Sequence, residues 1–325
     1  MLIHNKGEDE SMLLYAGKRI LYSIGTLLVI ITIVFSLLRL MPEEGYLGSG
    51  AEKMAPEQKE AILTNLGLRD SLPVQLGNFY KDLLAGDLGD SITYRPDVAV
   101  TTIIGEKIMY SLYFGLGAVL LSLVIGVPLG ILMARFKNRW IDRLGTGYIV
   151  FVVAVPAAVY YLVIQIYVTY IFDLPMLFDE YDPVSFILPL LSMALAPTAS
   201  YAMWMRRYMV DELNKDYIKL ARAKGLKDQT IMFSHVLRNA FIPMAQYLPA
   251  TILFTIVGSI YIESLYSIPG MGGLLVEAIQ RQDNTVVQAL VIVYSSIGII
   301  GLILGDLAMA IVDPRIKLGK GGSVR

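Results

Sequence analysis

Asp216-Tyr217-Ile218-Lys219-Leu220-Ala221-Arg222-Ala223-Lys224-Gly225 is a charged stretch that lies between strongly apolar segments of the chain. Apolar residues in and before it recur at positions i, i+4, i+7 and i+8, the spacing of one helix face: Leu213, Tyr217, Leu220 and Ala221. The opposite face of this helix is basic: Lys215, Lys219 and Arg222. The stretch therefore predicts an amphipathic helix that begins near Leu213.

A sharp turn is predicted directly after this helix. Gly225 is a helix stop signal, and Lys224 suits the negative end of the helix dipole. Asp228 can then cap a second helix, which contains His235 and runs toward Pro243. A helix, a turn and a second helix are therefore expected between two apolar spans.

This arrangement resembles the cytoplasmic EAA loop of ABC importer permeases, and most closely the loop of the oligopeptide/dipeptide branch. That branch typically reads Asp-Tyr-x-x-x-Ala-Arg-Ala-Lys-Gly-Leu and then His-x-Leu-Arg-Asn-Ala-x-Ile-Pro, and residues 216–243 carry every one of these positions. Lys219, Leu220 and Arg238 depart from the general EAA pattern in the way that the peptide branch does. The resemblance implies that the loop docks on an ATPase subunit through Leu213, Tyr217, Lys219, Leu220, Ala221, Arg222, Ala223, Lys224 and Gly225.

The composition indicates a polytopic membrane protein. Of the 325 residues, 55% are apolar and 17% are charged, so the charges must cluster outside the spans. Uncharged runs long enough to cross a bilayer predict six spans: residues 20–38, 108–134, 144–172, 183–205, 239–262 and 284–305. The expected fold is all-α, and the resemblance makes it a type I ABC importer permease fold.

The distribution of positive charge predicts the orientation. Residues 1–19, 135–143, 206–238 and 315–325 carry 19 of the 27 Lys and Arg residues. By the positive-inside rule, both termini and the Gly225 loop are cytoplasmic, in the cytoplasmic membrane of a bacterium or archaeon. A cleaved signal peptide is the alternative for the first span, but its apolar run is long and no Ala-x-Ala site follows.

Three regions are expected. Residues 1–107 hold the cytoplasmic N-terminus, the first span and an extracytoplasmic segment, in which helices are predicted from Pro56 to about residue 66 and over residues 74–84. Residues 108–312 resemble the permease core with five spans, including the EAA loop at about 211–242, and residues 313–325 form a cytoplasmic tail. The runs 86–91 and 267–272 resemble the Gly-Asp-Leu-Gly-x-Ser and Ile-Pro-Gly-x-Gly motifs of the family and predict turns.

The sequence argues against catalysis and ion coupling by this chain. It has no cysteine and only two histidines, His4 and His235, and it lacks nucleotide-binding, nucleophile-elbow and zinc-protease motifs. Asp306 is almost alone as an ionisable residue within the spans, so we expect it to have a partner there. The neutral side chains Tyr160, Tyr161 and Gln165 are candidates for a translocation pathway, and an interfacial tyrosine belt is the alternative.

The resemblance also implies the partners. These are a second homologous permease subunit in a heterodimer, two ABC ATPase subunits that hydrolyse ATP-Mg, an extracytoplasmic peptide-binding protein and the lipid bilayer. No cofactor bound by this chain and no nucleic acid are expected. A permease for nickel or another small solute, an ion-coupled secondary carrier and a membrane-embedded hydrolase are the alternatives.

The orientation is tested by single cysteines, because the native chain has none. Cysteines within residues 41–107 should react with an impermeant thiol reagent in intact cells, whereas cysteines within residues 215–227 should react only after the cells are opened. Labelling with the opposite sidedness would contradict the orientation and the docking of the Gly225 loop on an ATPase.

Overall fold

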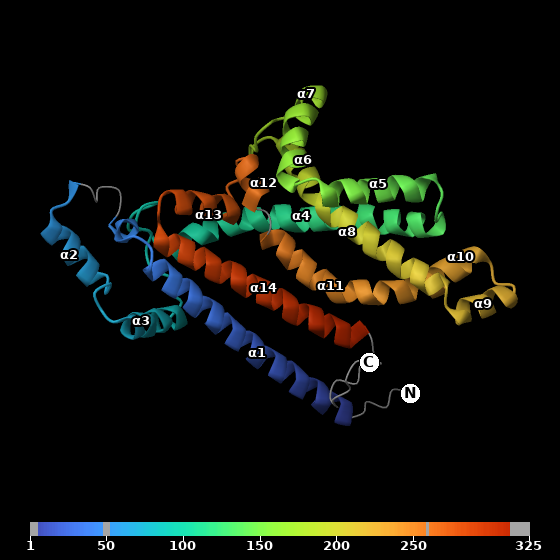
Figure 1. Cartoon of the computed structure of the whole chain (residues 1–325), viewed down its shortest axis with the longest axis horizontal. Coiled ribbons are helices and arrows are strands. Elements are labelled where there is room, and N and C mark those ends of the chain that lie inside the picture. The colour runs from blue at the N-terminus through green and yellow to red at the C-terminus, as the bar shows by residue number, and fades with distance from the viewer. Residues whose placement is uncertain (1–5, 48–52, 258–259, 313–325) are drawn as a thin grey trace. The chain divides into compact units, whose positions relative to one another are not determined.

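The computed structural model describes residues 6–47, 53–257 and 260–312, in which the regular structure is helical apart from one isolated bridge between Asp90 and Ala99 (Figure 1). The helices of the first half are α1 (Lys6–Arg39), η1 (Glu43–Tyr46), α2 (Pro56–Asn65), α3 (Leu72–Leu84), α4 (Val100–Arg135), α5 (Trp140–Ala154), α6 (Ala157–Val163), η3 (Ile164–Val168) and α7 (Thr169–Phe172). Those of the second half are η4 (Pro183–Phe186), α8 (Ile187–Leu213), α9 (Asp216–Ala223), α10 (Asp228–Thr230), η5 (Ile231–Leu237), α11 (Arg238–Val257), α12 (Ile260–Leu265), α13 (Met271–Gln280) and α14 (Asn284–Val312). His4 and the predicted tail lie outside the described residues.

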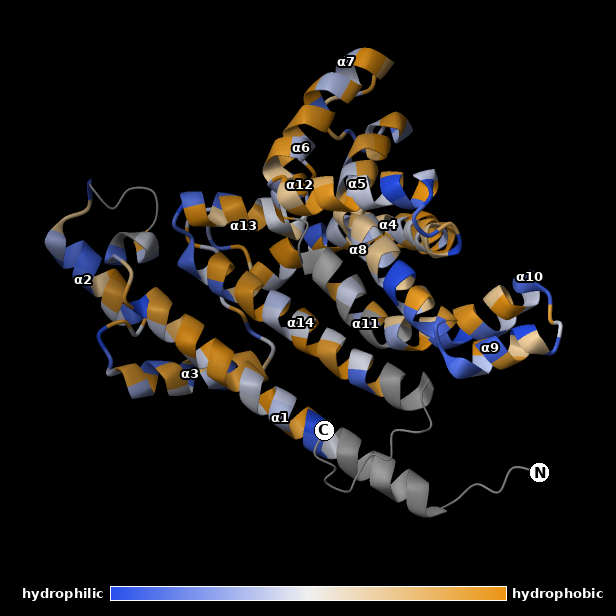
Figure 2. Cartoon of the chain, turned by 45° about the vertical axis from the view of Figure 1, so that its right-hand side comes forward, coloured by the Kyte–Doolittle hydropathy of each residue, from blue (hydrophilic) through white to orange (hydrophobic). Residues whose placement is uncertain are grey.

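Within the described residues, four helical segments are long and apolar enough to cross a bilayer: Gly17–Arg39, Val100–Arg135, Pro183–Leu213 and Asn284–Leu307. Apolar residues dominate these long helices, whereas α9 carries many hydrophilic ones (Figure 2). The first, second, fourth and sixth predicted spans are therefore confirmed as apolar helices. The fifth falls on α11 and α12, with residues 258–259 outside the description, so the count of six stays a prediction.

The third predicted span is not one continuous helix. Helix α5 and the segment from α6 to α7 meet at an angle of 110°, and this bend is visible in Figure 1. Pro156 is the physical reason, because its ring forces the residue before it out of the helical conformation and it has no N–H to donate. Val155 is accordingly extended, with φ −90° and ψ 130°. The two parts together are long and apolar enough to be one broken span, so the predicted span over residues 144–172 stays a prediction.

The chain forms two compact units. The first holds the described residues within 1–22, 114–256 and 300–325, and the second those within 23–113 and 257–299. The first has two apolar clusters, one around Met205, Met209 and Ile218 and one around Met133, Tyr160 and Ala202. The core of the second joins residues of α4, α13 and α14, such as Ile103, Leu274 and Leu290.

Two glycines bring α4 and α8 of the first unit into close contact. A Cβ atom on Gly126 would lie 2.7 Å from the carbonyl oxygen of Thr198, and one on Gly130 would lie 2.6 Å from that of Ala202. Glycines four residues apart lie on one face of a helix and let two backbones approach within a membrane. Any side chain at either position would push the helices apart.

The expected ion partner of Asp306 is present. Arg19 of α1 forms a salt bridge with Asp306 of α14, and the Asp306 side chain is only 19% exposed. Since an unpaired charge in an apolar span is costly, the pair explains how α14 tolerates a carboxylate.

The segment predicted to be extracytoplasmic forms both of its predicted helices, α2 and α3. Gly67 ends α2 with φ +69°, a left-handed conformation that suits glycine, while its N–H donates to the carbonyl oxygen of Thr64 at 2.9 Å. Arg69 then forms salt bridges with Glu43 at 2.6 Å and Glu60 at 2.7 Å. Its hydrogen bonds lower the pKa of both carboxyl groups.

Asp283, in the turn between α13 and α14, accepts hydrogen bonds from Ser91, the last residue of the family-like run 86–91, and from the three residues after it. The Asp283 side chain is fully buried, and its Oδ2 accepts the Ser91 hydroxyl at 2.7 Å. The same oxygen accepts the backbone N–H groups of Ile92, Thr93 and Tyr94 at 2.9–3.0 Å. Burial acts to raise the pKa of Asp283, but these hydrogen bonds outweigh it and leave the pKa below its usual value.

Asp283→Asn should destabilise the second unit by about 2 kcal/mol, because an amide cannot replace a carboxylate that accepts several hydrogen bonds. The measurement is the thermal unfolding of the purified protein at neutral pH.

The native protein should also lose stability in acid, whereas the variant should not show this loss. The loss begins as the pH falls below about 4, the ordinary pKa of aspartate, and is complete once the pH is below the lower pKa of Asp283 in the folded protein. Equal acid sensitivity of the two proteins would contradict the role of the Asp283 carboxylate.

Candidate functional site

The charged stretch forms the short helix α9, which begins three residues later than the sequence suggests. Helix α8 ends at Leu213, and Lys215, with φ −72° and ψ 148°, is the extended residue before α9. Asp216 is the first residue of α9, where a carboxylate is favourable to the helix dipole. Leu213 therefore does not belong to the helix of the stretch, and the prediction that it shares a face of that helix was wrong.

Gly225 ends α9 as predicted. Its φ is +78°, and its N–H donates to the carbonyl oxygen of Arg222 at 2.9 Å. The next N–H, that of Leu226, reaches back to the carbonyl oxygen of Ala221 at 3.2 Å. These bonds satisfy carbonyl groups that the end of a helix leaves free, and the left-handed residue that makes them possible is glycine.

The buried face of α9 differs from the predicted one. Ile218 is fully buried and Ala221 is 8% exposed, whereas Tyr217 is 39% and Leu220 56% exposed. Ile218 and Ala221 pack with Met205 and Met209 of α8 and with a group from the following helices: Ile231, Val236, Ala240 and Met244. The sequence analysis predicted the wrong buried face because its helical spacing was counted from Leu213, which lies outside α9. That spacing did not include Ile218, the residue that is fully buried.

The hydroxyl group of Tyr217 links α9 to both α8 and α11 by hydrogen bonds. That oxygen lies 2.6 Å from a carboxylate oxygen of Glu212, in α8, and accepts a hydrogen bond of 2.8 Å from Asn239, in α11. The remaining predicted coupling residues on and after α9 are exposed: Lys219, Leu220, Arg222, Ala223, Lys224 and Gly225. Leu220 is the largest apolar side chain among them and points away from the protein's own core.

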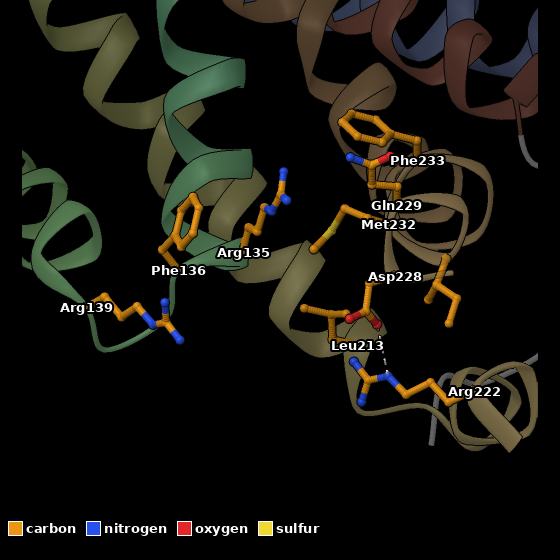
Figure 3. A pocket seen from close by; sticks show the side chains of 10 residues that line it. Arg135, Phe136, Arg139, Leu213, Arg222, Asp228, Gln229, Met232 and Phe233 are labelled. Carbon is orange, nitrogen blue, oxygen red and sulfur yellow. Dashed lines mark ion pairs between the residues drawn. The ribbon is translucent and has the colours of Figure 1, made fainter. Parts of the chain in front are cut away.

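The second helix of the loop begins at Asp228, but Asp228 does not cap it. Lys227 is the extended cap residue, and Asp228 occupies the first helical position. Its carboxylate lies 3.9 Å from Arg222, across the turn (Figure 3). Helix α10 then continues into the π-helix η5, which contains His235, and into α11.

Asp142 and Arg206 form an ion pair that the sequence analysis missed. Arg206 Nε lies 2.5 Å from Asp142 Oδ1, and its Nη2 lies 2.9 Å from Oδ2, which also accepts the N–H of Asn138. The Asp142 residue is 3% exposed. The sequence analysis counted Arg206 only as one of the basic residues of 206–238, and no sequence signal connects residues 64 positions apart. The pair joins the first turn of α5 to α8.

Two of the candidate pathway residues lie inside the helix packing of this chain. Tyr160 is 4% and Gln165 5% exposed, and Tyr160 belongs to the apolar cluster around Met133. Tyr161 is partly buried, and its ring lies 4.6 Å from that of Tyr160. The pathway role stays a prediction, and the burial of Tyr160 and Gln165 disfavours it.

The run 267–272 turns the chain between α12 and α13, as predicted. Glu263 of α12 is fully buried, and its Oε2 accepts the N–H of Gly272 at 2.6 Å in the first turn of α13. Ser111 of α4 accepts the neighbouring N–H of Met271 at 2.8 Å. Both glycines, 270 and 272, are necessary because a Cβ atom on Gly270 would collide with the Glu263 carboxylate and one on Gly272 with the backbone of Ile260. The sequence analysis did not single out Glu263.

Comparisons with known proteins decide the family. The model of the binding-protein-dependent transport system inner membrane component matches residues 126–318, and the model of the N-terminal part of such components matches residues 12–96. The chain belongs to this family. As an inner membrane component it is an integral membrane protein of a transport system, and its family is a transport family and not an enzyme family.

Relatives of this inner membrane component match most of its length. The dipeptide transport system permease protein DppB of Lactococcus lactis is 31% identical over 94% of this chain and 100% of its own. The glutathione transport system permease protein GsiC of Pectobacterium atrosepticum is 34% identical over 94% and 99%. The oligopeptide transport system permease protein AmiC of Streptococcus pneumoniae is 36% identical over 67% of this chain, but the match spans less than half, 44%, of AmiC.

A solved structure shows the same fold. The inward-facing MetNI methionine ABC transporter matches 66% of this inner membrane component and 97% of the compared chain, with a TM-score of 0.52 and 15% identity. The expected type I importer fold is thereby confirmed.

Gly225→Val should strain the turn after α9, because a β-branched residue in the left-handed conformation costs about 1–2 kcal/mol. A side chain there meets no atom within 4 Å, so the effect is on the backbone alone. In membrane vesicles whose cytoplasmic face is accessible, we expect trypsin to cleave the valine variant after Arg222 and Lys224 faster than it cleaves the native protein.

Gly225→Asn is the matched control, since asparagine tolerates this conformation and should leave cleavage near the native rate. Equal cleavage of the valine variant and the native protein would show that the turn does not depend on glycine.

Proposed function

We propose that this chain is the permease subunit of an ATP-driven importer of peptides. With a second homologous permease it would form the translocation pathway, receive peptide from an extracytoplasmic binding protein and dock on two ATPase subunits that hydrolyse ATP-Mg. The peptide class is supported by the names of its relatives, which are dipeptide, oligopeptide and glutathione permeases. The same names favour peptides over nickel as the substrate.

The packing of α9 is the observation that carries the proposal. Ile218 and Ala221 anchor α9 in a core shared with α8 and α11, while Leu220 remains exposed on the other side. A partner that moves α9 therefore moves the helices that it is packed against, because packed apolar interfaces transmit displacement. This is the mechanical requirement for alternating access driven from outside the chain.

The orientation of the chain supports ATPase docking. The excess of Lys and Arg in residues 206–238 favours a cytoplasmic α9, the compartment in which ATP is available. Ion coupling requires an intramembrane group that is available to bind the ion, and Asp306 is already paired with Arg19. The ion-coupled carrier is therefore the weaker candidate.

Leu220→Asp tests the docking. An unpaired carboxylate in a protein contact costs about 3 kcal/mol, a loss of more than a hundredfold in affinity. Because Leu220 is exposed in this chain, the variant should insert and fold normally, lose the ATPase subunits on purification and lose ATP-driven dipeptide uptake in proteoliposomes.

Leu84→Asp is the matched control, because Leu84 is 88% exposed on α3, in the segment predicted to be extracytoplasmic. It should keep both ATPases and uptake. Ala221→Asp should instead lower thermal stability, because Ala221 is buried. If Leu220→Asp retained the ATPases and transported at the native rate, α9 would not be the docking element.

A further inference from the structure

A basic pocket lies beside the Gly225 turn within the first unit. It has a volume of about 250 Å³ and is lined by residues from the end of α4, the connection to α5, the end of α8 and the loop helices. Figure 3 shows Arg135 and Phe136 across the opening from Gln229 and Met232. The pocket borders the proposed docking surface, because Arg222 of α9 lines it, but Leu220 does not.

The charges of this pocket are unbalanced. Three arginines line it, Arg135, Arg139 and Arg222, against the single carboxylate of Asp228. That carboxylate lies 3.9 Å from Arg222, so it offsets this arginine first. Within the described part of the chain, Arg135 and Arg139 form no ion pair and both are exposed. Two guanidinium groups are thus available to an anion, and guanidinium groups pair well with phosphate.

One side of the pocket lies where a long apolar helix gives way to charged residues. The apolar helix Val100–Arg135 ends at Arg135, which lines the pocket, whereas Leu213, another lining residue, ends α8 beyond the predicted span 183–205. Arg139, a third lining residue, directly precedes Trp140, which is 68% exposed at the first position of α5. Exposed tryptophans are typical of the headgroup layer of a membrane. Arg135, at the end of an apolar helix, and the exposed Trp140 beside Arg139 form the pattern expected at the depth of lipid phosphates.

The pocket also has an apolar wall. Phe136, Met232 and Phe233 line it together with the arginines, and Phe233 is 53% exposed. A free inorganic anion gains nothing by contact with apolar side chains, whereas the glycerol and upper acyl carbons of a lipid would pack against them and remove them from water. The combination of arginines, an apolar wall and the end of an apolar helix is that of a lipid headgroup site.

We propose that this pocket binds the phosphate of an anionic phospholipid through Arg135 and Arg139. The lipid would connect the end of α4 with the loop helices that follow the Gly225 turn, since both contribute to the pocket. The assignment of the pocket to the inner leaflet rests on the proposed orientation. An acidic side chain of an ATPase is the other anion that could enter, but the end of the apolar helix at Arg135 and the apolar wall favour the lipid.

Arg135→Gln with Arg139→Gln tests the proposal in the complete transporter, reconstituted in bilayers of phosphatidylglycerol and phosphatidylcholine in equal amounts. After gentle extraction, the ratio of the two lipids bound to the protein is measured by mass spectrometry. The native protein should retain phosphatidylglycerol preferentially, and each arginine removed should lower that preference about five-fold.

Lys137→Gln with Arg143→Gln is the matched control, because Lys137, on the same connection, and Arg143, near the start of α5, are both exposed and neither lines the pocket. It removes the same charge and should keep the native preference. Arg135→Lys with Arg139→Lys should keep most of it, since the charge remains. Should the glutamine pair fail to insert, Arg139→Gln alone, in the exposed connection, should still give the five-fold loss.

Three results would overturn the proposal. The first is an equal lipid preference in the native protein and the glutamine pair, or an equal loss in the control pair. The second is full displacement of phosphatidylglycerol by excess inorganic phosphate, which would indicate a site for the free anion. The third is loss of the ATPases from the glutamine pair with unchanged lipid retention, which would indicate a protein contact. Leu220→Asp should release ATPases without changing the lipid ratio, so the two proposals fail independently.

Discussion

The burial of Ile218 and Ala221 against α8 and α11 is the interaction on which the rest of the loop depends. Helix α9 has only eight residues, and a helix of that length is not stable in water by itself. Its fold therefore comes from tertiary packing and from the hydroxyl of Tyr217, which contacts residues of both neighbouring helices. A short helix held in this way can carry exposed apolar residues such as Leu220 without losing its position.

Buried carboxylates organise the connections elsewhere. Asp283, Glu263 and Asp142 all have side chains removed from water, and each accepts at least one backbone N–H. The cost of burying such a group is offset only when its oxygens are fully hydrogen-bonded. These residues therefore fix irregular backbone that apolar packing alone would leave undefined, at a turn, at a helix start and between two helices.

The sequence predicted the features that depend on local rules. Long apolar runs gave four spans, Gly67 and Gly225 ended helices, and α2 and α3 were placed within a few residues. It failed where the outcome depends on partners distant in the chain. The face of α9 was misplaced because the pattern was counted from Leu213 and could not show that Ile218 packs against α8 and α11. Asp142 was missed because its partner Arg206 lies 64 positions away, and Glu263 because it accepts a backbone N–H, that of Gly272, which no residue type indicates. Pro156 was a local signal of the break after α5, and it was overlooked.

The π-helix over Ile231–Leu237 is a place where the chain can lose one residue without disturbing the helices on either side. A π turn holds an additional residue compared with an α turn, so a one-residue deletion inside it can restore α geometry without opening a gap. Each residue of an α-helix turns the chain by about 100°, and such a change anywhere else in the second loop helix would rotate every side chain that follows. A chain that lost one residue at this point would therefore keep the orientation of the side chains of α11.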